Sequence, residues 1–275
     1  MIDLHTHSDR SDGSLAPADL AARAAAAGID VLALTDHDTT AGLADADGAA
    51  RQLGIRLVPG VEISASWRSQ AIHVLGLWID PESAALRRAL DTQAERRRLR
   101  MDKICAHLAS IGLPGAQLKA AVAAVEGLPT RSHLAQALVD LGLVASIEDA
   151  FRRYLGRGRA AQIAAEWPEL SDVVGWITAA GGVASLAHPL RYALSSGARR
   201  SLLEDFKACG GTAIEVVTGG NAAHQIDACA MLAVRYGLSG TVGSDFHDPQ
   251  RAWNPLGRLA KLPDCVIPAW KNHGA

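Results

Sequence analysis

Short hydrophobic runs alternate with helical patterns along the first 80 residues of the chain. Pro17 and Gly28 bracket an alanine-rich segment in the way that proline and glycine bracket helices. The segment 30–36 is almost entirely apolar, as in a strand buried on both faces of a parallel sheet. We predict helices over 17–28 and about 40–53, and strands over 2–5, 30–36, 56–59, 62–67 and 71–78. This alternation is typical of βαβ units, with the last two strands forming a hairpin.

A long helical block interrupts this alternation. From residue 83 to about residue 155 the pattern is helical, divided only by glycine and proline. The strand and helix alternation then resumes, with helices near 170–180, 199–208 and 222–236 and strands over 182–187, 213–217 and 239–243. The sequence therefore predicts an α/β domain formed by 1–98 and 161–275, with a helical insertion over 99–160 that packs over the strand ends as a substrate cap.

Composition limits the class of protein. Hydrophobic residues make up 49% of the 275 positions and charged residues 20%, which excludes a disordered chain. Aromatic residues are few, so we expect a core of aliphatic side chains. We find neither an apolar run long enough to span a membrane nor a secretory signal, and we expect a cytoplasmic protein. The four cysteines form no CxxC pair, which favours reduced thiols.

Charge is unevenly distributed along the chain. Residues 87–159 carry 13 Lys and Arg against 7 Asp and Glu, whereas the formal net charge of the whole chain is −2. A basic helical segment is often only a solvated surface, but it can also gather anionic substrates. The acidic remainder of the chain suits cation binding.

Histidine and acidic residues recur at the ends of the predicted strands. His5 and His7 are two residues apart, so both imidazoles face the same side of an extended chain. In a parallel α/β barrel the strand ends meet on one face, where active sites are built. A lone residue of this kind is usually a cap, but nine of them predict a shared metal site. The nine are His5, His7, Asp12, His37, Glu62, His73, His188, Asp245 and His247.

The chemistry of these side chains narrows the choice of metal. Imidazole and carboxylate ligands without cysteine suit Mn²⁺, Fe²⁺ or Zn²⁺, and nine groups are enough for two or three ions bridged by a carboxylate. We expect two to three divalent metal ions, with Mn²⁺ favoured.

Six motifs together resemble the polymerase and histidinol phosphatase (PHP) superfamily. They are HTHSD at 5–9 with Asp12, LTDHD at 34–38, GVEIS at 60–64, IHVLG at 72–76, AHP at 187–189 and GSDFH at 243–247. The resemblance implies a distorted seven-stranded (β/α) barrel holding up to three metals. It further implies three ligand groups, which are His5, His7, Glu62 and Asp245, then Glu62, His73 and His188, and then Asp12, His37 and His247.

The helical insertion also resembles one branch of this superfamily. LPTRSHL at 128–134 and the segment 147–159 are similar to PHP phosphoesterases that act on nucleotides and short RNA, above all to nucleoside 3′,5′-bisphosphate phosphatases. Thr130 is a predicted N-cap, and the first turn of a helix favours an anion. An ordinary capped helix with solvated arginines is the alternative interpretation. The predicted substrate-binding residues are Arg131, Ser132, His133, Arg157 and Arg159, together with Asn221 and His224 at the mouth of the site.

These observations predict a phosphoesterase that hydrolyses the 3′-phosphate of nucleoside 3′,5′-bisphosphates by a metal-bound hydroxide. We expect Asp245, His247 and His37 to be the catalytic residues, although a metal ligand is a compromised proton donor and the general acid stays open. The alternative is a 5′-to-3′ exoribonuclease acting on short 5′-phosphorylated oligonucleotides. A binding module would leave gaps in the ligand set, and a metal amidohydrolase would have no use for the basic insertion. We expect a nucleotide or short oligonucleotide as the substrate, with neither a membrane nor a stable protein partner.

Overall fold

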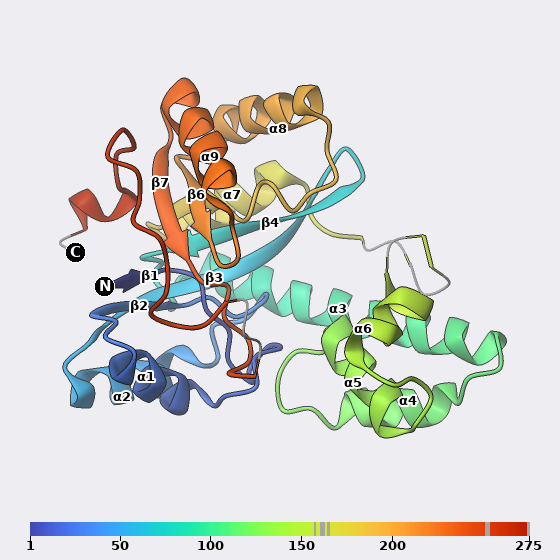
Figure 1. Cartoon of the computed structure of the whole chain (residues 1–275). Coiled ribbons are helices and arrows are strands. Elements are labelled where there is room, and N and C mark those ends of the chain that lie inside the picture. The colour runs from blue at the N-terminus through green and yellow to red at the C-terminus, as the bar shows by residue number, and fades with distance from the viewer. Residues whose placement is uncertain (157, 160–162, 164–165, 251–253, 274–275) are drawn as a thin grey trace. The chain divides into compact units, whose positions relative to one another are not determined.

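The computed structural model describes residues 1–156, 158–159, 163, 166–250 and 254–273. The chain folds into two compact units, one formed by Met1–Leu90 with Trp167–Ala275 and the other by Asp91–Glu166 (Figure 1). The first unit contains the β-sheet. Among the described residues of the second unit, helices are the regular elements and no strand occurs.

Seven strands form one sheet whose spatial order follows the chain. They are β1 (Ile2–Asp3), β2 (Val31–Leu34), β3 (Arg56–Trp67), β4 (Gln70–Leu77), β5 (Val183–Leu186), β6 (Ala213–Thr218) and β7 (Ser239–Gly243). All neighbours are parallel except β4, which runs antiparallel to β3 and β5. The backbone N–H of Leu4 donates to Val242 O at 2.9 Å and that of His7 donates to Phe246 O at 2.9 Å, so the first and last strands nearly close the sheet. The predicted α/β fold and seven-stranded barrel are therefore confirmed.

Aliphatic side chains fill the barrel and the space beneath its helices. One buried cluster gathers residues of β2, β3 and β4, including Val58 and Leu75, with Leu4 from the segment after β1. The helices of this unit are α1 (Pro17–Ala26), α2 (Leu43–Leu53), α7 (Leu170–Ala179), α8 (Ser196–Ala208) and α9 (Ala223–Tyr236), with a short 3₁₀ helix, η2 (Ala269–Asn272). Helix α9 packs on β6, and α7 packs against β3, β4 and β5. The expectation of an aliphatic core is confirmed.

The predicted break between strands 56–59 and 62–67 is wrong, because β3 continues through Pro59 and Gly60. Its first part pairs with β2 and its second part pairs with β4. A Cβ at position 60 would lie 2.8 Å from Thr35 Cγ2 and 3.0 Å from Leu34 O, so only glycine allows this close approach. Proline and glycine therefore mark a change of partner here and not the end of a strand.

The second unit is a small helical bundle. Its helices are the later part of α3 (Ala84–Ser110), α4 (Gly115–Ala123), α5 (Arg131–Asp140), α6 (Ile147–Ala150) and a π-helical turn, η1 (Phe151–Leu155). Ile104, Leu118, Leu134 and Leu138 are buried in its own core. Among the described residues, no helix of either unit has the length and apolar character needed to cross a membrane.

Candidate metal centre

The nine predicted ligands lie together at one end of the barrel. Seven come from the segments that follow β1, β2, β5 and β7. Glu62 and His73 lie inside β3 and β4, so the expectation that every ligand sits at or near a strand end is wrong for these two. Three groups have donor atoms within 4.8 Å of one another, namely His5, His7 and Asp245, then His37, Glu62 and His73, and then His7, Asp12, His37 and His247.

Glu62 adds a second carboxylate to the first group, which then has two imidazoles and two carboxylates. The Nε2 atoms of His5 and His7 are 3.1 Å apart, and Asp245 Oδ1 lies 3.3 Å from the first and 3.2 Å from the second. Glu62 Oε2 lies 3.5 Å and 3.4 Å from the same two nitrogens. Four donor atoms of these types directed at one point fit a divalent transition-metal ion.

Glu62 connects this group to its neighbours. Its Oε1 lies 3.0 Å from His73 Nδ1 and 3.0 Å from His188 Nε2, whereas its Oε2 lies 2.9 Å from His37 Nδ1. The register of β3 and β4 brings Glu62 close to His73. Glu62 pairs with Leu75, and Ser64, the next residue on the same face of β3, pairs with His73. The two oxygens of one buried carboxylate thus face different sets of imidazoles.

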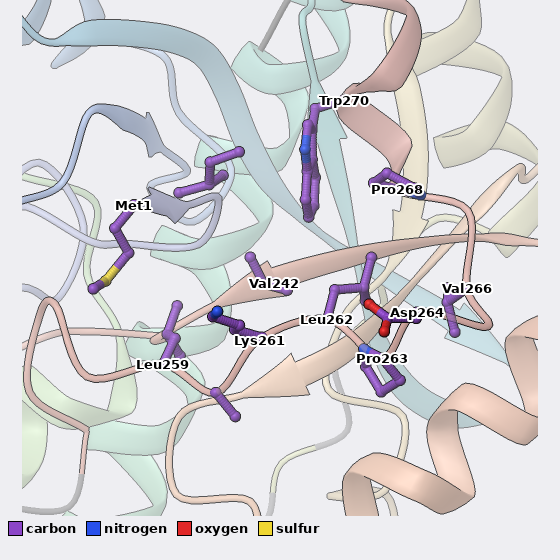
Figure 2. Close-up of a pocket in the computed structure, with 12 residues that line it drawn as sticks. Met1, Val242, Leu259, Lys261, Leu262, Pro263, Asp264, Val266, Pro268 and Trp270 are labelled. Carbon is purple, nitrogen blue, oxygen red and sulfur yellow. The ribbon is translucent and has the colours of Figure 1, made fainter.

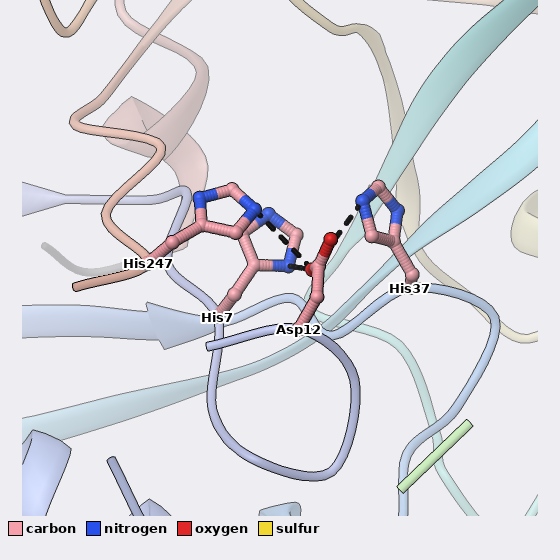
Figure 3. Close-up of side chains that lie close together, drawn as sticks. All are labelled: His7, Asp12, His37 and His247. Atoms are coloured by element: carbon pink, nitrogen blue, oxygen red, sulfur yellow. Dashed lines mark ion pairs between the residues drawn. The ribbon is translucent and has the colours of Figure 1, made fainter. Parts of the chain in front are cut away.

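Asp12 is at the centre of the third group (Figure 3). Its Oδ1 lies 3.3 Å from His247 Nε2, 3.7 Å from His37 Nε2 and 4.0 Å from His7 Nδ1. The loop carrying Asp12 is held by the buried Asp36 carboxylate, which accepts hydrogen bonds from Ser8 N at 2.7 Å, Ser8 Oγ at 2.6 Å and Ser11 Oγ at 2.6 Å. Asp36 therefore fixes the backbone between two predicted ligands.

The electrostatics keep the three carboxylates and His7 in the forms that cations bind. Burial alone raises the pKa of the Asp12, Glu62 and Asp245 carboxyls, but the nearby imidazoles outweigh it and hold each pKa well below its usual range. Burial, followed by the charge of His247, lowers the pKa of His7 to about 3, which leaves this imidazole neutral. Burial lowers the pKa of His247, but the charges of Asp12 and Asp245 outweigh burial and raise this pKa to about 9. A cation that binds the His247 ring therefore displaces a proton.

Backbone strain coincides with the cluster. His188 has φ of 29° and Asp245 has φ of 54°, in a region that residues with a Cβ seldom adopt. The Asp245 amide donates to His5 O at 2.8 Å and so holds that strained position. Strain of this kind gathers at functional sites, where the surrounding structure fixes it.

Two residues of the centre were not identified from the sequence. Arg191 forms an ion pair with Asp245 Oδ2 and donates to Gly219 O at 3.1 Å. Glu215 is fully buried in β6, with Oε1 3.0 Å from His5 Nδ1 and Oε2 accepting from His188 N at 2.6 Å. A carboxylate inside the otherwise uncharged strand AIEVVT was the signal that could have identified Glu215.

The predicted substrate residues of the barrel unit lie around α9. Asn221 Oδ1 accepts from Thr218 N at 2.8 Å, so its side chain shapes the turn after β6. His224 is exposed in the first turn of α9. Their contact with a substrate stays a prediction.

The helical unit carries the remaining predicted substrate residues. Thr130 is the N-cap of α5, and its Oγ1 accepts from Ser132 N at 3.2 Å, whereas His133 Nδ1 accepts from Thr130 N at 3.1 Å. Arg131 donates to Leu155 O at 3.2 Å. The predicted N-cap is confirmed. Arg159 is exposed, and Arg157 lies outside the described residues.

Positive charge is concentrated beside α5. Burial and then the charges of Arg131 and Arg97 lower the pKa of Arg100 to about 10. Arg97 itself is 7% exposed. The three guanidinium groups therefore lie close enough inside one unit for their charges to repel one another.

A separate pocket of about 570 Å³ lies beside the N-terminal strand (Figure 2). Met1, Ile2, Val242 and Trp270 contribute to its largely apolar wall. Its lining includes none of the predicted site residues that the structure describes. The polar cluster is therefore the candidate active site.

A seven-stranded α/β barrel with a cluster of His, Asp and Glu at one end defines a metal-dependent hydrolase. The model of the PHP domain matches residues 3–115. A 5′-3′ exoribonuclease of Haemophilus influenzae is 43% identical over 269 residues, which are 98% of this chain and 97% of that protein. A 3′,5′-nucleoside bisphosphate phosphatase of Chromobacterium violaceum is 40% identical over 272 residues, 98% of this chain and 95% of that protein. The chain belongs to the PHP family and is a hydrolase of that family.

Two solved structures share the fold. One from Chromobacterium violaceum, described as an amidohydrolase with bound sulfate and no metal, has a TM-score of 0.91 and 39% identity, covering 98% of this chain and 95% of that one. Another, from Bifidobacterium adolescentis and described as a metal-dependent phosphoesterase, has a TM-score of 0.82 and 27% identity, covering 99% and 94%. The resemblance found in the sequence is confirmed at the level of the family and the fold.

Proposed function

We propose that this chain hydrolyses the 3′-phosphate of nucleoside 3′,5′-bisphosphates with two to three divalent metal ions bound at the barrel end. The observation that carries the proposal is the position of Glu62. Its Oε1 lies 3.0 Å from His73 Nδ1 and its Oε2 lies 2.9 Å from His37 Nδ1, so the two oxygens of one carboxylate face two sets of imidazoles, as a carboxylate that bridges two ions would. The phosphatase named in Chromobacterium violaceum supports this substrate class.

The resemblance to the PHP superfamily implies how the donors divide among the ions. His5, His7, Glu62 and Asp245 would hold one ion, Glu62, His73 and His188 a second, and Asp12, His37 and His247 a third. When bound, such ions lower the pKa of water and neutralise the oxygens of the phosphate. Imidazole and carboxylate donors favour Mn²⁺, with Fe²⁺ and Zn²⁺ as alternatives.

Residues of the chain orient this centre. Arg191 holds one oxygen of Asp245, which leaves Oδ1 directed at His5 and His7. His247 Nδ1 lies 2.8 Å from Asp245 O, and donation to this oxygen turns Nε2 toward Asp12. Asp245, His247 and His37 are the residues that we propose as catalytic. Each also serves as a ligand, so none of them is assigned as the general acid.

We propose that the remote phosphate of the substrate binds at the start of α5. The positive end of a helix dipole favours an anion, and Arg131 supplies a planar fork of donors. The lowered pKa of Arg100 beside Arg131 and Arg97 supports an excess of positive charge there. Under this proposal Arg131, Ser132, His133 and Arg159 contact the 5′-phosphate, and the helical unit acts as a cap.

A second candidate function is 5′-to-3′ exoribonuclease activity on short RNA. The relatives of Haemophilus influenzae, Salmonella typhimurium and Escherichia coli carry that name, at 43%, 38% and 38% identity. The same residues would then hold the 5′-phosphate of an oligonucleotide.

Product analysis separates the two functions. The chain is incubated with Mn²⁺ and either a nucleoside 3′,5′-bisphosphate or a short 5′-phosphorylated RNA, and inorganic phosphate and mononucleotides are measured. Phosphate from the first substrate supports the phosphatase, and mononucleotides from the second support the exoribonuclease. Turnover of an amide panel with neither of these products would contradict both.

A further inference from the structure

Glu215 lies between two of the predicted ligand groups without belonging to either. Its side chain is 0% exposed on β6. One oxygen faces the His5 ring and the other accepts from the backbone N–H of His188. Because its two oxygens bind residues of different groups, this one side chain holds His5 and His188 in position relative to each other.

The His5 contact determines which ring nitrogen carries the proton. A carboxylate at 3.0 Å favours a proton on His5 Nδ1 and leaves Nε2 with a free lone pair. That Nε2 is the atom 3.1 Å from His7 Nε2 and 3.3 Å from Asp245 Oδ1. The opposite tautomer would direct an N–H at the same point and oppose cation binding.

The His188 contact holds a strained backbone. His188 has φ of 29°, and its N–H donates to Glu215 Oε2 at 2.6 Å. Its ring then places Nε2 3.0 Å from Glu62 Oε1. Gly243 makes room for this arrangement, since a Cβ there would lie 2.7 Å from Glu215 Oε1 and 2.2 Å from His5 Cβ.

We propose that Glu215 is the positioning residue of this centre, fixing the tautomer of His5 and the backbone of His188 at the same time. The proposal rests on the metal centre of the proposed function. Outer partners of ligating histidines orient the ring and raise its basicity, and their loss costs ~10- to 100-fold in metal affinity.

Glu215→Gln tests this proposal because an amide cannot accept a hydrogen bond from both His188 N and His5 Nδ1 with its single oxygen. The His188 amide N–H can only donate, so the single oxygen of glutamine is required there. The NH₂ group then faces His5 Nδ1 and forces the proton onto Nε2. The alternative rotamer sets the NH₂ group against the His188 N–H and leaves two donors opposed.

Asp3→Asn is the matched control. It is the same acid-to-amide change at a carboxylate that is 0% exposed and close to His5, and Asp3 is not one of the predicted ligands. Its Oδ1 accepts from the backbone N–H groups of His5 at 3.3 Å and Ser244 at 2.9 Å, and the single oxygen of asparagine can accept from both. The change therefore removes a buried carboxylate near the cluster while preserving these hydrogen bonds.

Metal affinity is measured on the full chain by competition with a fluorescent chelator for Mn²⁺ and Zn²⁺. Glu215→Gln is expected to weaken binding ~10- to 100-fold, with Asp3→Asn much closer to wild type. Burial lowers the pKa of His5, but Glu215, Glu62 and Asp245 outweigh it and raise that pKa well above its usual value, so histidine ¹⁵N NMR of the metal-free chain is recorded at a pH high enough for the ring to carry a single proton. That proton is expected at Nδ1 in wild type and at Nε2 in Glu215→Gln. The His5 signals are identified by their loss in a His5→Ala chain.

Equal affinity in wild type and Glu215→Gln, or His5 protonated at Nε2 in wild type, would overturn the role of Glu215. A similar loss in both amide variants would also overturn it, because charge alone would then explain the effect. A wild-type chain that binds no divalent metal would instead overturn the proposed function, and this proposal with it. If Glu215→Gln fails to fold, the wild-type NMR spectrum still decides the tautomer.

Discussion

Arg131→Ala separates substrate recognition from chemistry. The guanidinium donates to Leu155 O at 3.2 Å and stacks with its centre 5.9 Å from the Phe151 ring, so it is held in place at the start of α5. Under our proposal it makes a charge-assisted hydrogen bond to the remote phosphate, worth ~1.5–3 kcal/mol. That energy corresponds to a fall in kcat/KM of about 10- to 200-fold for a nucleoside 3′,5′-bisphosphate.

A simple aryl phosphate provides the internal control, since it has no group to occupy the Arg131 position. Its kcat/KM is expected to stay near the wild-type value in Arg131→Ala. Arg152→Ala is the matched variant, because Arg152 lies in the same helical unit and its side chain is 74% exposed in an ion pair with Asp149. Removing this charge is expected to leave both substrates nearly unaffected.

Steady-state kinetics of the two variants on the two substrates tests the reasoning. Equal losses on both substrates in Arg131→Ala would mean that Arg131 supports the fold or the catalytic centre. No loss of kcat/KM on either substrate would mean that Arg131 does not bind the substrate. A loss of the same size in Arg152→Ala would mean that net charge of the helical unit, and not a specific contact, attracts the substrate.

Three further outcomes are expected. Asp245→Ala lowers kcat by several orders of magnitude with an unchanged circular dichroism spectrum. Glu62→Ala lowers kcat at least as strongly, because Glu62 contacts two ligand groups. Retention of turnover in either variant would contradict the proposed site. Phe206→Ala, at a side chain 0% exposed, lowers the free energy of unfolding in urea by ~3–5 kcal/mol. The exposed Cys265 reacts first with a thiol reagent at pH 8, whereas burial raises the pKa of Cys229 to about 12 and keeps it unreactive; labelling of Cys229 in the folded chain would refute this.

Local patterns predicted most of the fold because each carries its own physical signal. The apolar segment 30–36 contains β2, and the proline and glycine around 17–28 bracket α1. The continuous β3 could not be predicted, since Pro59 and Gly60 normally end a strand. Only the close approach of Gly60 to Leu34 and Thr35, which is a tertiary contact, explains why β3 continues.

The nine predicted ligands could be picked out because histidine and acidic residues recur in few other contexts so regularly beside strands. The acid inside the strand AIEVVT marks Glu215 as unusual, but the sequence gives no hint of its partners. Its contacts with His5 and His188 join residues 210 and 27 positions apart and exist only in the closed barrel. The preference for Mn²⁺, the cytoplasmic location and the substrate contacts of Asn221 and His224 stay predictions.

Metal titration of the stripped chain tests the central claim most directly. The chain is treated with a chelator, dialysed and titrated with Mn²⁺, while bound metal and phosphate release from a nucleoside 3′,5′-bisphosphate are measured on the same samples. We predict two to three ions per chain, with activity absent before the titration and restored as the sites fill. Full turnover by the chelated chain, or activity that does not follow bound metal, would contradict this account.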